Sequence, residues 1–297
     1  MRIFVTGATG FVGSAVVRDL LDHGHQVLGL ARGDAGAAAL TAAGAQVHRA
    51  DLSDLDALRA GAALSDGVVH TAFNHDFANF AASCALDRDA IQAMGEALAG
   101  SNRPLIVTSG TGVLNPGGLT TEQTPPPAEN AALPRESEAA ALAFTTRGVR
   151  ASVVRLPPSV HGDGDHAFVP LLIGLAREKG HAAYIGDGLN TWPAVHRLDA
   201  AKVYRLILEN PDAGTIFHAT AEPGVAMKEI ATIIARRLNL PAVSLKPDEA
   251  AEYYGWFTYF ASLNNKASST WTQQTLGWHP THPTLLTDLD HPRYFPT

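Results

Sequence analysis

The beginning of the chain places the tightest constraint on its fold. A short apolar run from Ile3 to Val5 leads directly into the segment Thr6-Gly7-Ala8-Thr9-Gly10-Phe11-Val12-Gly13, and a helical pattern covers residues 11–23. In such a strand–turn–helix unit, Gly7 allows the tight turn, Gly10 lets the backbone approach a pyrophosphate, and Gly13 lets the helix pack closely on the sheet. The helix N-terminus adds N–H donors and the positive end of a dipole. The segment therefore predicts a dinucleotide-binding fold.

Short apolar runs alternate with Ala-rich helical stretches through the first half of the chain. This alternation predicts right-handed βαβ units and a mainly parallel sheet. The predicted fold class is α/β: a Rossmann-type doubly wound parallel sheet with a smaller C-terminal substrate-binding lobe. Strands are expected at residues 3–5, 27–31, 45–50, 67–71, 105–109 and 150–156, and helices at 11–23, 35–43, 54–63, 79–100 and 135–147.

The βα rhythm breaks at Pro157-Pro158, and Gly, His, Trp and Tyr become more frequent beyond it. We expect residues 1–162 to form the dinucleotide-binding domain, with a strand and a helix returning to it from about residues 191–220. Residues 163–297 are expected to form mainly the substrate-binding lobe. Its expected elements are helices at 167–179, 199–209, 226–238 and 248–254 and a strand at 214–219.

The amino-acid composition narrows the range of possible functions. The formal net charge is −7 and no basic patch is visible, which disfavours a nucleic-acid partner. No apolar run reaches the roughly 18 residues of a membrane span. The single cysteine, Cys84, favours a reducing compartment. With a strand starting almost at Met1, which leaves no room for a signal peptide, the expected location is cytoplasmic.

Several segments together resemble the short-chain dehydrogenase/reductase superfamily, specifically its extended and atypical branches of the NAD-dependent epimerase/dehydratase type. The similarity begins with the TGxxGxxG pattern of residues 6–13 and extends over essentially the whole chain. The further matching segments are Arg49-Ala50-Asp51-Leu52, Val69-His70-Thr71-Ala72-Phe73, Val107-Thr108-Ser109-Gly110-Thr111, Val154-Arg155-Leu156-Pro157-Pro158-Ser159-Val160-His161-Gly162 and Leu276-Gly277-Trp278-His279-Pro280.

The resemblance implies a nicotinamide dinucleotide cofactor. In this family an Asp after the third strand faces the adenine, and the turn after the fourth strand lies over the adenine ribose. The cofactor-binding residues it implies are Gly7, Thr9, Gly10, Phe11, Val12, Gly13, Arg32, Asp51, Leu52, Thr71, Ala72, Phe73, Ser109, Leu156, Pro157 and Pro158.

The end of the second predicted strand indicates which nicotinamide is bound. NAD-selective relatives carry an Asp or Glu there to hold the ribose 2′-OH, whereas this chain has Ala31 followed by Arg32. Because this chain has no carboxylate at that position, a 2′-phosphate would not be repelled there. The guanidinium of Arg32 can pair with such a phosphate. We therefore expect NADP(H) to be preferred over NAD(H). The alternative is that Arg32 is an ordinary solvated surface residue.

The resemblance fails at the usual catalytic pair. Most of the superfamily uses a Tyr and a Lys four residues later on the helix after the fifth strand. Aligning Ser137 with the usual YxxSK pattern places Pro134 at the Tyr and Glu138 at the Lys, and no tyrosine occurs between residues 1 and 183. The standard proton donor is therefore missing.

Other residues are candidates for the chemistry. Ser109 and Thr111 carry hydroxyls at the end of the fifth strand, the edge where such sheets bind ligands, although Ser and Thr also favour turns. Arg135 can polarise a carbonyl or remain at the surface. His161 follows the sixth strand, and histidine suits proton transfer near neutral pH. The substrate-lining candidates are His75, Tyr184, Trp192 and His196, the last of which also suits a structural role.

The predicted function is an NADP(H)-dependent oxidoreductase that transfers a hydride between the nicotinamide and a carbonyl or imine carbon of a small organic substrate. The proton would come from His161, from water ordered by Arg135, or from the substrate itself. The alternatives are a non-catalytic NADP(H)-binding sensor and a sugar-nucleotide epimerase or dehydratase. A homodimer through helices 79–100 and 135–147 is also expected. The segment from His161 to His166 contains two His and two Asp, which could hold a divalent metal ion. The simpler interpretation is a Gly-rich loop that becomes ordered over the cofactor.

Overall fold

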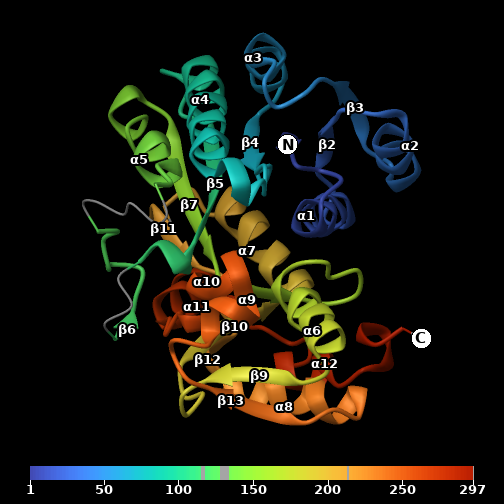
Figure 1. Cartoon of the computed structure of the whole chain (residues 1–297). Helices are drawn as coiled ribbons and strands as arrows, with labels where there is room; N and C mark the ends of the chain where they lie inside the picture. The colour runs from blue at the N-terminus through green and yellow to red at the C-terminus, as the bar shows by residue number, and fades with distance from the viewer. Residues whose placement is uncertain (115–117, 128–133, 213, 297) are drawn as a thin grey trace.

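A seven-stranded, all-parallel sheet organises the N-terminal part of the computed structural model, which describes residues 1–114, 118–127, 134–212 and 214–296 (Figure 1). The strand order is β11-β7-β5-β4-β1-β2-β3, so the order reverses between β1 and β4. In open α/β sheets, ligands bind outside the carboxyl ends of the strands at this switch point. The strands are β1 (Arg2–Thr6), β2 (Gln26–Ala31), β3 (Gln46–Arg49), β4 (Gly67–His70), β5 (Pro104–Gly110), β7 (Arg150–Leu156) and β11 (Ile216–His218).

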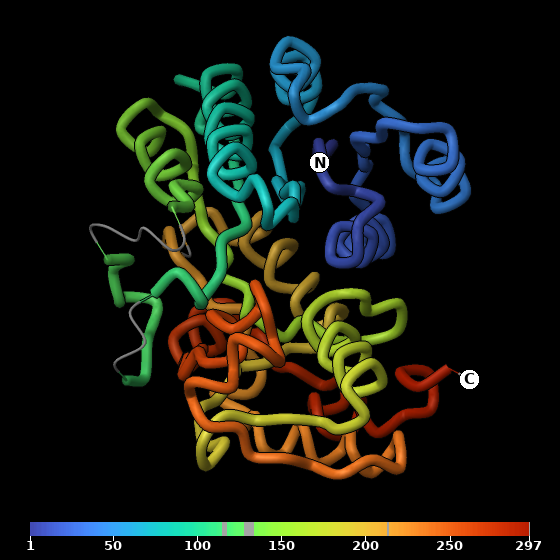
Figure 2. The backbone as a smooth tube through the Cα atoms, in the orientation of Figure 1, coloured from blue at the N-terminus to red at the C-terminus, as the bar shows by residue number. Residues whose placement is uncertain are grey.

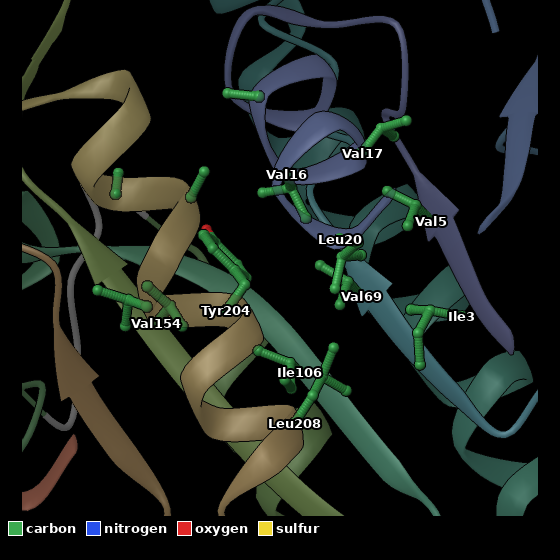
Figure 3. Close-up of a cluster of buried hydrophobic side chains, with 14 of the residues drawn as sticks. Ile3, Val5, Val16, Val17, Leu20, Val69, Ile106, Val154, Tyr204 and Leu208 are labelled. Carbon is green, nitrogen blue, oxygen red and sulfur yellow. The ribbon is translucent and has the colours of Figure 1, made fainter. Parts of the chain in front are cut away.

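Helices cover both faces of this sheet because its strands are apolar on both sides. On one face α1 (Phe11–Asp22) and α7 (Arg197–Glu209) pack against each other and on the strands. Figure 3 shows this core, in which Val16 and Leu20 of α1 meet Val5 and Val69 of the sheet. The other face carries α3 (Leu55–Ala63), α4 (Phe80–Leu98) and α5 (Ser137–Leu142), while α2 (Asp34–Ala43) packs beside β2 and β3.

The later chain forms a second lobe with a core of its own, seen beside the carboxyl edge of the sheet in the tube of Figure 2. It contains a three-stranded sheet, β12-β10-β8, and the parallel pair β13-β9, and the short strand β14 (Lys266–Ala267) pairs with β6 (Leu119–Thr120). The strands are β8 (Ser159–His161), β9 (Ala182–Ile185), β10 (Thr191–His196), β12 (Glu222–Ala226) and β13 (Ala242–Leu245). The helices are α6 (Phe168–Lys179), α8 (Met227–Leu238), α9 (Ala250–Tyr254), α10 (Thr258–Ser262), α11 (Thr270–Leu276) and α12 (Leu285–Leu289).

The predicted fold class is confirmed, and the six strands expected in the first half are all present with small shifts at their ends. The helix expected over 135–147 is shorter. It ends at Leu142 and gives way to a 3-10 turn at Thr145–Arg147, where the Thr145 hydroxyl donates to the Leu142 carbonyl at 2.7 Å. Gly148, with a φ of 69°, then reverses the chain.

The strands β8, β9, β10, β12 and β13 were not expected from the sequence, because each is short and only partly apolar. The strand expected at 214–219 is β11, and it joins the main sheet beside β7. None of the helices within the described ranges combines the length and the apolar character needed to cross a bilayer.

Candidate functional site

A cleft of about 1240 Å³ lies along the carboxyl ends of the main strands and faces the second lobe. It runs from the glycine turn after β1 and the end of β2, past the ends of β4 and β5, to α6 and α10. All residues expected to hold the cofactor line it. Its lining includes Gly7, Thr9, Gly10, Phe11, Val12, Gly13, Arg32, Asp51, Leu52, Thr71, Ala72, Phe73, Ser109, Leu156, Pro157 and Pro158.

The glycine turn fits the tight backbone path that the sequence predicted. Gly7 has a φ of 65°, and the Gly10 amide donates to its carbonyl at 2.9 Å. A Cβ placed on Gly13 would lie 2.0 Å from the Gly7 oxygen, so no side chain fits there. Gly10 begins α1 without a side-chain cap, and the first N–H groups of a helix have no partner within it. These donors line the cleft and suit a pyrophosphate.

The end of β2 lines the cleft next to the glycine turn, where the sequence predicts the adenosine of the cofactor. Ala31 is buried and carries no polar group, whereas Arg32 extends into solvent with 82% of its side chain exposed. Its guanidinium lies 3.8 Å from the Asp51 carboxylate, a loose surface pair. Hydrogen bonds from the backbone N–H and the hydroxyl of Ser53, together with Arg32, keep the pKa of Asp51 below its usual value despite partial burial.

Glu138, which the sequence alignment places where the resemblance implies a lysine, forms a buried ion pair. Its two carboxylate oxygens accept hydrogen bonds from Arg155 on β7, at 2.8 Å from Nε and 2.7 Å from Nη2. The Ser109 hydroxyl also donates to Glu138, at 2.8 Å. The proton of Ser109 is therefore engaged, and its oxygen can offer only a lone pair to a ligand. No lysine precedes Lys179 in the chain, so the N-terminal part has no substitute for the missing ammonium group.

Arg135 brings a cation to the cleft wall. Its guanidinium donates to the Ser137 hydroxyl at 2.7 Å and to the Thr108 carbonyl at 2.9 Å, and it lies over the Phe73 ring at 4.2 Å from the ring centre. Its Nε is also 3.9 Å from the carboxylate of Asp87, which is fully buried on α4. These contacts fix the Arg135 side chain at the end of β5.

Asp87 links this cation to the glycine turn. It accepts hydrogen bonds from Ser137 and, at 3.1 Å, from Nε2 of the buried His70. Burial alone would raise the pKa of Asp87, but His70 and Arg135 outweigh it and hold the pKa below its usual value. An ionised carboxylate only accepts, so Nε2 of His70 is the donor to Asp87, and Nδ1 contacts the Thr6 hydroxyl at 2.7 Å. The sequence could not reveal this chain of contacts, because its members lie on β1, β4, α4 and the segment before α5.

Two of the expected catalytic residues lie outside the cleft. Thr111 is buried, and its hydroxyl donates to Asn265 at 2.7 Å, so it ties the end of β5 to the second lobe. His161 lies on β8, where successive side chains alternate between faces: Val160 lines the cleft, whereas His161 points into the lobe and contacts Asp288 at 2.9 Å. Desolvation lowers the pKa of His161 to about 4, so the ring is neutral at pH 7.

Three of the expected substrate residues are also outside the lining. Trp192 is fully buried in the core of the second lobe and donates to the Phe260 carbonyl at 3.0 Å. His196 stacks on His282 and caps α7, and Tyr184 packs beneath Lys228. Each is used in packing because its strand, β9 or β10, runs through the lobe core rather than along the cleft.

His75 does line the cleft, beside the rings of Phe73 and Phe77. Desolvation and the nearby charge of Arg135 lower its pKa. Sequence reasoning did not place the aromatic side chains that line this part of the cleft. Three of them come from the later chain, where aromatic residues are concentrated, and two come from the start of the α4 region. The rings that line the cleft here are Phe77, Phe80, Phe168, Trp256 and Phe260.

The loop from His161 to His166 turns through Gly162 and Gly164, both with positive φ. Asp165 accepts from the Ala167 amide at 2.9 Å, and the His166 ring meets Phe11 edge-on at 5.8 Å. Within the described part of the chain, no three His, Cys, Asp or Glu side chains converge as metal ligands. Because His166 contacts Phe11, the loop lies against the start of α1, beside the glycine turn.

The fold and the cleft define the class: a Rossmann-type protein with a glycine turn for phosphates and a second lobe facing it. Residues 3–219 match the model of the NAD dependent epimerase/dehydratase family. The chain is also 53% identical over 299 residues to an uncharacterized protein of Schizosaccharomyces pombe, covering 99% of this chain and all of that protein. It belongs to this family, and the predicted extended-branch membership is confirmed.

One more distant relative and one structurally similar protein have assigned activities. The sterol-4-alpha-carboxylate 3-dehydrogenase (decarboxylating) of Dictyostelium discoideum is 28% identical over 248 residues, covering 78% of this chain and 74% of that protein. The structure of dTDP-glucose 4,6-dehydratase DesIV from Streptomyces venezuelae, with NAD bound, superimposes with a TM-score of 0.78 at 21% identity, covering 98% and 95% of the two chains. The family context supports an enzyme, while the second comparison shows the fold alone.

Proposed function

We propose that this protein is an NADP(H)-dependent oxidoreductase that transfers a hydride between the nicotinamide and a carbonyl or imine carbon of a small organic substrate. The observation that carries this proposal is the single continuous cleft. It begins at the glycine turn and ends where Ser109 and Arg135 meet an apolar wall. A dinucleotide laid along the turn would reach the ends of β5 and β7, where substrate and nicotinamide must meet.

The preference for NADP(H) rests on Arg32. Its guanidinium is exposed at the cleft and only loosely paired with Asp51, so it is free to bind a 2′-phosphate at little cost. The buried Ala31 presents no carboxylate that would hold a 2′-OH or repel the phosphate. In a chain of net charge −7, this local cation is the group that can hold the extra phosphate.

When bound, NADPH supplies the hydride that converts a carbonyl to an alcohol, and one proton completes the balance. Arg135 would polarise the carbonyl oxygen, since its guanidinium stays charged at any working pH. For the same reason Arg135 does not release the proton itself. His161 is buried outside the cleft. Of the two remaining sources, water ordered by Arg135 and the substrate itself, we propose the water. Ser109, whose proton goes to Glu138, would accept a hydrogen bond from the product hydroxyl.

A second candidate, a non-catalytic NADP(H) sensor, is favoured by one observation. Both members of the usual Tyr–Lys pair are replaced, and Glu138 is committed to a structural ion pair. Tight NADPH binding without turnover on any carbonyl or imine would support the sensor. A nucleotide-sugar epimerase or dehydratase, the third candidate, shares the family but depends on the missing Tyr.

The cofactor assignment is tested by titrating NADPH and NADH into the wild-type protein and into Arg32→Asp. We expect the variant to raise the dissociation constant for NADPH at least about tenfold more than that for NADH, because it loses one charge-assisted contact and adds a like charge. Arg49→Asp is the matched control, since Arg49 pairs with Asp34 and lies outside the lining. Equal losses for both cofactors in Arg32→Asp would overturn the assignment.

Three further expectations remain part of the proposal. The division places the cofactor domain at 1–162, with a strand and a helix returning from about 191–220, and mainly the substrate lobe at 163–297. The separate core of many later residues supports it. A homodimer would pair the faces of α4 and α5, and the location would be cytoplasmic. Size-exclusion chromatography with light scattering checks the dimer.

A further inference from the structure

The substrate end of the cleft is built from aromatic rings. Phe77, on the 3-10 turn Phe77–Asn79, stacks between Phe80 of α4 at 5.7 Å and Trp256 of the second lobe at 4.7 Å. Phe168 of α6 and Phe260 of α10 continue this surface, with their ring centres 4.7 Å apart. We call these five side chains the aromatic wall. It joins both lobes and lines the same cleft as Arg135, whose guanidinium lies over the Phe73 ring, 5.8 Å from the ring of Phe80.

The charges around this end are few. Among the described residues that line the cleft, Arg32 and Arg135 are the Lys or Arg side chains, and Arg32 belongs to the adenosine end. Arg135 is itself partly balanced by the buried Asp87. The lining contributed by the second lobe is apolar apart from Asp165 and His166, which lie beside the glycine turn. A nucleotide diphosphate at the substrate end would therefore be desolvated with little cationic compensation.

We propose that the substrate is a compact aromatic ketone or aldehyde and not a nucleotide-diphosphate sugar. This inference rests on the proposed oxidoreductase function. Its ring packs against the aromatic wall, where face and edge contacts and the burial of apolar surface favour a flat apolar body. Its carbonyl oxygen accepts from Arg135, the anchored donor at this end. The aromatic wall therefore selects an aromatic ligand, and the hydrogen bond from Arg135 orients its carbonyl group.

The test is a ligand-observed NMR titration of the protein saturated with NADP⁺. The probes are 4′-fluoroacetophenone, its saturated analogue cyclohexyl methyl ketone, and dTDP-glucose. We expect the aryl ketone to bind, the saturated ketone to bind more weakly, and dTDP-glucose to be the weakest of the three. In Trp256→Ala the affinity for the aryl ketone falls about tenfold, because one ring of contact is lost.

Trp256 is suited to this substitution because 55% of its surface is exposed, so the fold tolerates its removal. Phe295→Ala is the control, since it removes a partly buried ring of the second lobe that does not line the cleft. Tighter binding of dTDP-glucose, binding of none of the probes, or unchanged aryl-ketone affinity in Trp256→Ala would each overturn the proposal. Failure of NADP⁺ to bind in the initial saturation would instead refute the proposed function.

Discussion

The ion pair between Glu138 and Arg155 offers a sharp test of whether Glu138 has a structural role in this chain. Arg155 is fully buried, and two of its hydrogen bonds go to Glu138, with others to the Thr124 carbonyl and to His218. In Glu138→Leu the guanidinium stays buried without its counter-charge. Two lost charge-assisted hydrogen bonds at about 1.5–3 kcal/mol each sum to about 3–6 kcal/mol. The cost of breaking a buried pair by removing one partner, about 3–5 kcal/mol, falls within this range.

The assay is urea unfolding followed by circular dichroism and tryptophan fluorescence, whose agreement checks two-state behaviour. Glu138→Leu, Arg155→Met and the double variant form a cycle. We expect a coupling free energy of at least about 2 kcal/mol, because the double variant no longer buries an unpaired charge. Asp22→Asn, which breaks the exposed pair with Arg18, is the control and should cost less than about 1 kcal/mol. Additive losses in the cycle would refute the interpretation of Glu138 as a compensated structural residue.

Three other predictions concern the turn, the buried histidines and the anchored cation. Gly13→Ala should abolish NADPH binding in a fluorescence titration while the protein stays folded, because its Cβ would meet the Gly7 oxygen at 2.0 Å; retained affinity would contradict the turn geometry. The folded-state pKa of His161 is about 4, below the unfolded value of 6.5, so the unfolded chain binds more protons between these values. Unfolding free energy should therefore fall as pH drops from 6.5 to 4, by up to about 3 kcal/mol for this residue, and His161→Gln should flatten that fall in denaturation curves measured across the range. Asp87→Asn should weaken binding of 4′-fluoroacetophenone severalfold at unchanged NADP⁺ affinity, because Arg135 loses its counter-charge; an equal loss for both ligands would indicate general damage.

Much of the N-terminal fold could be predicted because buried parallel strands read as continuous apolar runs between helices. The run at Ile3 to Val5 and the glycines after it fix the start of the sheet and the phosphate end of the cleft. The short strands of the second lobe gave no comparable signal. His161 illustrates the consequence: the sequence placed it near the correct strand end, but a strand alternates its faces, and Val160 took the cleft side.

The catalytic end was less accessible to sequence reasoning. The chain shows that Glu138 replaces the expected Lys, but not that Arg155, 17 residues later, lies against it. The aromatic wall combines Phe77 with Trp256, whose contact depends on how the two lobes pack. Such pairings are tertiary, and no local pattern encodes them.

The central claim is that hydride transfer occurs in this cleft without the usual Tyr–Lys pair. The most direct measurement supplies the protein with NADPH deuterated at either face of C4 and with a panel of aryl aldehydes and ketones, and follows deuterium in the alcohol by mass spectrometry. We predict that deuterium appears from one of the two labelled cofactors and that Arg135→Ala lowers the rate at unchanged NADPH affinity. Tight NADPH binding with no deuterium transfer to any carbonyl would contradict the claim and favour the sensor.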